Sequence, residues 1–184
     1  MLESRKYQFW FCTGSQDLYG DECLYEVAEH SKKMVEGMNQ TGLLPFELIW
    51  KPTLIDSASI RKTLNDANAE ADCAGVIVWM HTFSPAKMWI LGLQEYRKPL
   101  LHLHTQFNRD IPWDTIDMDF MNTNQSAHGD REFGHIVSRM GIERKVVVGH
   151  WADESVVSRI GDWMRTAVGV MESSHIRVVR VGDN

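Results

Sequence analysis

Cysteine is scarce in this sequence, and long apolar runs and clusters of basic residues are absent. The three cysteines, Cys12, Cys23 and Cys73, form an odd set without C-x-x-C spacing, which argues against a disulfide framework or a zinc cluster. Reduced, mostly buried thiols in a cytoplasmic protein are expected. No apolar run reaches the ~18 residues of a membrane span, and the start, MLESRKYQFW, lacks the apolar segment of a signal peptide. The net charge of -6, without a basic run, argues against a nucleic-acid-binding surface.

The composition is that of a soluble globular protein. Of the 184 residues, 43% are hydrophobic and 24% are charged, which provides enough apolar side chains for one domain with a core. The sequence has no repeat, no low-complexity stretch and no linker, so a single domain over residues 1–184 is expected. The seven Trp and ten Met residues are types that both cores and subunit contacts use.

Short apolar segments alternate with segments of helical spacing along the chain. Strands are predicted at residues 7–13, 46–50, 75–80, 100–104, 145–148 and 176–181. Helices are predicted at residues 21–40, 85–96, 118–140 and 153–172, and around residues 60–67, where Ser57 or Ser59 can cap the helix. This alternation predicts an α/β fold with a doubly wound, mostly parallel sheet and helices on both faces, of the Rossmann or flavodoxin-like kind.

The first predicted strand runs into a loop at residues 13–20, with the sequence TGSQDLYG. In open α/β sheets, ligands bind where such loops leave the carboxyl ends of the strands, so this is a candidate ligand loop. It has neither the Lys of a P-loop nor the glycine spacing of a dinucleotide-binding turn. Residues 13–15 are weakly similar to the phosphate loops of flavin-binding folds, and a plain turn with capping residues explains the loop equally well.

Two further segments carry side chains suited to a sugar. Phe83 follows the third predicted strand and could stack on a sugar face, contact a partner, or lie under its own loop. Gln125 and His128 are three residues apart and share a face if the segment is helical. Amide and imidazole groups both donate and accept hydrogen bonds, which suits hydroxyl-rich ligands. A solvated helix face is the alternative.

His102 and His104 alternate along the fourth predicted strand, so both side chains point to one face of the sheet. Two imidazoles can take part in a Mn, Fe or Zn site, but two histidines alone are a weak motif, and a hydrogen-bonded core pair is favoured. The nearby acids Asp114, Asp117 and Asp119 lack the glycine and the distal glutamate of a calcium loop. Capping and turn roles are expected for them.

Longer blocks of sequence are more specific than any of these short motifs. They are residues 14–20 (GSQDLYG), 79–89 (WMHTFSPAKMW), 102–114 (HLHTQFNRDIPWD), 117–122 (DMDFMN) and 124–134 (NQSAHGDREFG). These blocks closely resemble the L-arabinose isomerase family, and the similarity spans essentially the whole chain. Proteins of this family are much longer, so the chain is similar to their N-terminal portion, an α/β domain. We therefore expect a fragment of a longer protein.

The resemblance implies interconversion of L-arabinose and L-ribulose, and of D-galactose and D-tagatose, through an enediol assisted by a divalent metal, usually Mn2+. It places the metal ligands and catalytic glutamates in later domains, so no catalytic residue and no metal ligand is expected in this chain, and the isolated chain is expected to be inactive. It also implies a hexamer, a dimer of trimers, in which this domain completes a neighbouring subunit's active site. The positions implied to contact the sugar there are Gln16, Leu18, Tyr19, Phe83, Gln125 and His128.

Two other classes of function remain open at this stage. The chain could be a non-enzymatic module that binds a sugar or assembles with itself through Trp- and Met-rich surfaces. It could also be a flavodoxin-like mononucleotide binder, in which case the purified protein would show flavin absorbance.

Overall fold

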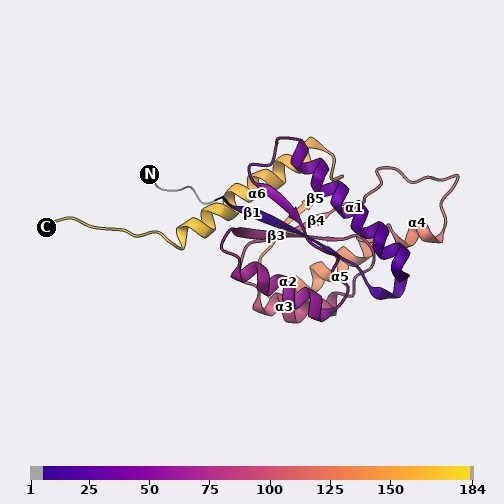
Figure 1. The fold of residues 1–184 in the computed structure, drawn as a ribbon, viewed down its shortest axis with the longest axis horizontal. Helices are drawn as coiled ribbons and strands as arrows, with labels where there is room; N and C mark the ends of the chain where they lie inside the picture. The colour runs from indigo at the N-terminus through magenta and orange to yellow at the C-terminus, as the bar shows by residue number, and fades with distance from the viewer. Residues whose placement is uncertain (1–5, 183–184) are drawn as a thin grey trace.

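Five parallel strands form one sheet, in the order β2-β1-β3-β4-β5 (Figure 1). The computed structural model describes residues 6–182, apart from the side chain of Tyr19. The strands are β1 (Gln8–Gly14), β2 (Glu47–Trp50), β3 (Cys73–Met80), β4 (Leu100–His104) and β5 (Lys145–Val148). Each of the first five predicted strands is therefore present.

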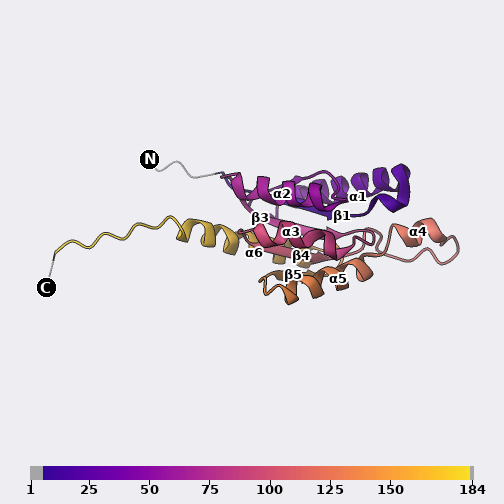
Figure 2. The ribbon, with the colours of Figure 1, turned by 90° about the horizontal axis from the view of Figure 1, so that it is seen from below.

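Helices cover both faces of this sheet, which confirms the doubly wound α/β fold (Figures 1 and 2). One face carries α1 (Gly20–Gln40) and α6 (Glu154–Ser173), and the other carries α2 (Ser57–Ala69), α3 (Ile90–Glu95) and α5 (Ser126–Arg139). Side chains alternate along a strand, so Phe9 and Phe11 of β1 pack in the core with α1 and α6, whereas Trp10 and Cys12 pack in the other core. None of the described helices is long and apolar enough to cross a membrane.

Local side chains fix where the helices begin. The Asp56 side chain accepts a hydrogen bond from the backbone nitrogen of Ser59 at 2.7 Å, and the backbone nitrogen of Asp56 donates to Ser59 Oγ at 3.3 Å. This capping box makes Asp56 the N-terminal cap of α2. The prediction that Ser57 or Ser59 caps this helix is therefore wrong. Short 3-10 turns, η1 (Asp17–Tyr19) and η2 (Ala86–Trp89), lead into α1 and α3.

The predicted helix at residues 118–140 is in fact two helices, α4 (Met118–Asn122) and α5. The backbone nitrogen of Thr123 still makes the helical bond to the Asp119 carbonyl, at 3.1 Å. At Asn124 the backbone nitrogen donates to the Met121 carbonyl at 3.2 Å, and the side-chain Nδ2 donates to the Phe120 carbonyl at 2.9 Å. The Asn124 side chain thus takes the carbonyl that its backbone would bind in a continuous helix, so the helix stops and α5 starts anew.

The predicted strand at residues 176–181 is wrong. No strand forms there within the described residues, and the segment extends away from the sheet (Figure 1). Val178, Val179 and Val181 are 88%, 81% and 94% exposed. Valine favours a strand only where neighbouring side chains pack against it, and here none do. Residues 1–5 and 183–184 lie outside the described residues.

All carboxyl ends of the strands meet at one edge because the sheet is parallel. The long connection after β4, with α4 on it, projects from this edge, opposite both ends of the described chain (Figures 1 and 2). Loop residues that follow different strands are therefore brought together here, which makes this edge the place to look for a site.

Candidate functional site

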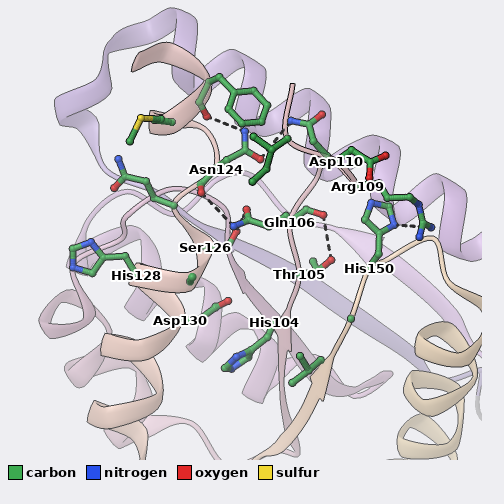
Figure 3. Close-up of a pocket in the computed structure, with 18 of the residues that line it drawn as sticks. His104, Thr105, Gln106, Arg109, Asp110, Asn124, Ser126, His128, Asp130 and His150 are labelled. Atoms are coloured by element: carbon green, nitrogen blue, oxygen red, sulfur yellow. Dashed lines mark hydrogen bonds between the residues drawn. The ribbon is translucent and has the colours of Figure 1, made fainter. Parts of the chain in front are cut away.

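A cavity of about 800 Å³ lies at the carboxyl edge of the sheet, beside β4 and β5 (Figure 3). The connection after β4 leads to α5 on one face of the sheet, and the connection after β5 leads to α6 on the other. Connections that diverge in this way leave a crevice at the strand ends, and open α/β sheets bind ligands in such crevices.

Two of the six predicted sugar-contact residues line this cavity, and a third contacts one of them. Gln125 and His128 line it from the start of α5. The ring of Phe83 stacks on His128, with 4.7 Å between ring centroids and 28° between ring planes. Phe83 is half-buried and does not itself line the cavity, but its ring contacts one of the residues that do.

The other three predicted residues belong to the loop after β1. Gln16 is half-buried and Leu18 is 83% exposed, and neither lines the cavity. The side chain of Tyr19 lies outside what the structure describes. A hydrogen bond of 2.7 Å between Ser15 Oγ and Thr82 Oγ1 ties this loop to the one after β3. The two loops therefore share the edge, while Gln16 and Leu18 remain outside the cavity.

A polar network in the cavity wall was missed from sequence. Ser126 Oγ donates to Gln106 Oε1 at 2.9 Å, and Gln106 Nε2 donates to the Asn124 carbonyl at 3.2 Å. Figure 3 shows these side chains in the centre of the cavity. The signal in the sequence was an amide, Gln106, two residues after the predicted strand at residues 100–104.

A positive charge at the cavity was also missed from sequence, and the guanidinium group of Arg109 supplies it. Arg109 Nη2 donates to Asp153 Oδ1 at 2.7 Å and to His150 Nδ1 at 3.2 Å. His150 Nε2 lies 3.2 Å from the Phe107 carbonyl and must donate to it, since a carbonyl only accepts. This leaves Nδ1 of His150 as the acceptor for Arg109, and the guanidinium group is held at the cavity.

Three connected side chains lie at the cavity end beside β4. Asp130 Oδ1 is 2.7 Å from His102 Nε2, and His102 Nδ1 is 3.0 Å from His104 Nε2. His104 and Asp130 line the cavity (Figure 3), and His102 and Asp130 are buried. Burial penalises charge, so it raises the pKa of Asp130 to about 8 and lowers the pKa of His102 to about 3. The favoured core pair is present, extended by a carboxyl group that the sequence did not reveal.

A model of the L-arabinose isomerase N-terminal domain matches residues 3–175. The chain belongs to the L-arabinose isomerase N-terminal domain family. This confirms the resemblance found in the sequence. The chain is 62% identical over 184 residues to the L-arabinose isomerases of Geobacillus thermodenitrificans and Geobacillus stearothermophilus, and 59% identical to that of Clostridium beijerinckii. Each match covers 100% of this chain and 37% of the relative, so the chain spans little more than a third of their length.

The Mn2+ that the L-arabinose isomerase resemblance implies does not fit the side chains present here. Among the described residues, His102, His104 and Asp130 bring metal-ligating atoms within 4.8 Å of one another. The two contacts use different ring nitrogens of His102, so one ion cannot replace both. Besides burial, the charge of Arg144 lowers the pKa of His102, and it would also repel a cation.

Helix α5 holds Gln125 and His128 in place through a close approach at Gly129. A Cβ atom there would lie 2.9 Å from Met80 Cβ and 2.9 Å from the Thr82 carbonyl oxygen. We expect Gly129→Ala to lower the free energy of unfolding by about 1–3 kcal/mol, because the backbone must move to admit the methyl group. Urea denaturation measures this.

Gly169→Ala on α6 is the matched control. A Cβ atom at Gly169 meets nothing within 4 Å, and alanine is the better helix former. This variant should therefore be as stable as the parent or more stable. An equal loss of the free energy of unfolding in Gly129→Ala and Gly169→Ala would refute the close approach at Gly129.

Proposed function

We propose that this chain is the sugar-contacting N-terminal part of an L-arabinose isomerase, which converts L-arabinose to L-ribulose and D-galactose to D-tagatose. The chain spans 37% of the length of its relatives. We therefore assign Mn2+ binding and proton transfer between C1 and C2 to residues outside this chain. The observation that carries the proposal is the cavity at the carboxyl edge of the sheet, lined by amide and imidazole groups in a chain of this family.

The chemistry of the cavity wall suits a polyhydroxylated ligand. Each amide and each neutral imidazole offers both a donor and an acceptor, as each sugar hydroxyl does. The amide and imidazole residues of the wall are Gln106, Asn108, Asn124, Gln125, His104, His128 and His150. Their part in the reaction is to hold the sugar in one orientation, and correct orientation contributes several kcal/mol in favourable cases.

A neighbouring subunit completes the site in this proposal. Leu18, Trp113 and Met118 are 83%, 77% and 64% exposed, and aromatic residues and Met are enriched in subunit interfaces. They support self-association as a trimer or as a dimer of trimers. In that assembly, Gln16, Leu18 and Tyr19 face the substrate of the neighbour.

A chimera tests the proposed function. This chain replaces the matching segment of the Geobacillus thermodenitrificans isomerase, to which it is 62% identical. Gln125→Ala and His128→Ala should each lower kcat/KM of the chimera about tenfold, the loss expected for one hydrogen bond to a bound hydroxyl. Sedimentation velocity of the same chimera tests the assembly.

His135→Ala is the control, since His135 is exposed on the same helix and does not line the cavity. Its kcat/KM should equal that of the chimera. The proposal fails if Gln125→Ala and His128→Ala are as active as His135→Ala.

A further inference from the structure

Asp130, His102 and His104 form a hydrogen-bonded chain that starts inside the protein and ends at the cavity. Asp130 comes from α5 and the histidines from β4. The contacts are 2.7 Å between Asp130 and His102 and 3.0 Å between the two rings. Nδ1 of His104, the outer end, has no hydrogen-bond partner among the described residues and is not a buried atom. Since His104 lines the cavity, this nitrogen is open to a ligand.

The hydrogens of these three side chains can be arranged in two ways. With Asp130 ionised, His102 donates from Nε2 to Asp130, His104 donates from Nε2 to His102, and Nδ1 of His104 is an acceptor. With Asp130 protonated, the carboxyl group donates to His102, His102 donates from Nδ1 to His104, and Nδ1 of His104 carries a hydrogen. Both rings are neutral in both arrangements. The two differ by one proton, and each makes both hydrogen bonds.

We propose that these three side chains form a proton relay that takes one proton from a hydroxyl group bound at the cavity and stores it on Asp130. The O–H bond of the ligand breaks as a hydrogen binds Nδ1 of His104. The Nε2 hydrogen of His104 passes to Nδ1 of His102, and the Nε2 hydrogen of His102 passes to the carboxylate. The electron pair of the broken bond stays on the ligand oxygen, so one negative charge moves from Asp130 to that oxygen.

The identity of the hydroxyl group rests on the proposed function. In a cyclic aldose it is the anomeric hydroxyl. When this group loses its proton, its electron pair forms the C1 carbonyl, the bond between C1 and the ring oxygen breaks, and the ring oxygen takes a proton from water. The relay then opens the sugar ring and supplies the open-chain aldose that isomerisation requires.

The surroundings favour the carboxyl group, and not a ring, as the place where the proton rests. Burial lowers the pKa of His102 to about 3, and the charge of Arg144 adds to this effect. Burial also lowers the pKa of His104, while it raises that of Asp130 to about 8. The titratable groups that share the cavity are Arg109, Asp110, His128 and His150.

Ring-nitrogen NMR of the ligand-free chain tests the relay, because the chemical shifts report which nitrogen of each histidine carries the hydrogen. As pH rises through about 8, the hydrogen of both rings should move from Nδ1 to Nε2 at one shared midpoint. The carboxyl carbon signal of Asp130 should titrate at that midpoint too. In Asp130→Asn the shared transition should disappear, as a carboxylate that fixes a histidine tautomer requires. His135→Gln should leave it unchanged.

The relay is overturned if the two rings titrate at separate midpoints, if Asp130→Asn keeps the transition, or if both rings carry the hydrogen on Nε2 at every pH. One equivalent of Zn2+ that shifts both rings and abolishes the transition would identify a metal site and would also overturn it. If Asp130→Asn does not fold, the shared midpoint in the parent protein decides. No sugar is present, so this outcome is independent of the proposed function. If Gln125→Ala and His128→Ala of the chimera are as active as His135→Ala, the proposed function is rejected and the relay is unaffected.

Discussion

Replacing Phe133 with alanine is expected to lower the free energy of unfolding by about 3–5 kcal/mol. The side chain is 0% exposed and packs in the core between the sheet and α2, α3 and α5. Its ring meets Trp89 edge-on at 5.2 Å between centroids and His102 at 4.8 Å. Truncation leaves a cavity beside these rings that the surroundings fill only in part, so the transfer cost and the cavity cost add. Urea denaturation of parent and variant measures the loss.

Phe83→Ala is the matched control for this prediction. Phe83 is half-buried, and its described ring contact is the stack on His128. We expect its removal to cost about 1 kcal/mol, the value of such a pair, and to weaken sugar turnover in the chimera. Similar stability losses in the two variants would contradict the assignment of Phe133 to the core and Phe83 to the site.

Acid is expected to destabilise this protein through His30 and His81. Their rings are joined by a hydrogen bond of 2.8 Å between His30 Nδ1 and His81 Nε2. His30 stacks on Phe107 at 3.6 Å between centroids, and His81 stacks on Trp79 at 4.3 Å. Burial lowers the pKa of His30 to about 4 and that of His81 to about 3, from an ordinary value of 6.5.

Whether acid stabilises or destabilises the protein depends on which state, folded or unfolded, binds protons at the higher pH. The pKa values of the two histidines are lower in the folded protein than in the unfolded chain. Below about pH 6.5 the unfolded chain therefore binds protons that the folded protein does not bind, and the free energy of unfolding falls. Between about pH 7 and pH 5 the loss is about 2 kcal/mol for each histidine. The double variant His30→Gln/His81→Gln should therefore lose about 4 kcal/mol less than the parent over this range. His175→Gln, at an exposed position, should lose as much as the parent. Parallel pH profiles for the double variant and the parent would rule out this origin.

The regular parts of the fold could be predicted because their signals are local. Cys73–Met80 is an apolar run with every residue buried, and α1 carries Met34 and Met38 at helical spacing on its buried face. The break between α4 and α5 could not be predicted, because it depends on the Asn124 side chain, which binds a carbonyl of the preceding turn. Residues 176–181 show the opposite error, since strand-forming side chains do not make a strand without a neighbour.

The site was predictable in its loops and not in its interior. Gln125 and His128, which line the cavity, could be picked out because their spacing matches a helix. Asp130 looked like one more charge in a polar stripe, since only the fold brings it to 2.7 Å from His102. The positions of Arg109 and His150 at one cavity depend equally on the long connection after β4.

The central claim is that this chain supplies the sugar-contacting part of a larger isomerase and not its whole chemistry. The most direct measurement is L-ribulose formation from L-arabinose with Mn2+, by the isolated 184-residue chain and by the chimera described above. We expect turnover by the chimera and none by the isolated chain. Turnover by the isolated chain, or a folded and assembled chimera without activity, would contradict it.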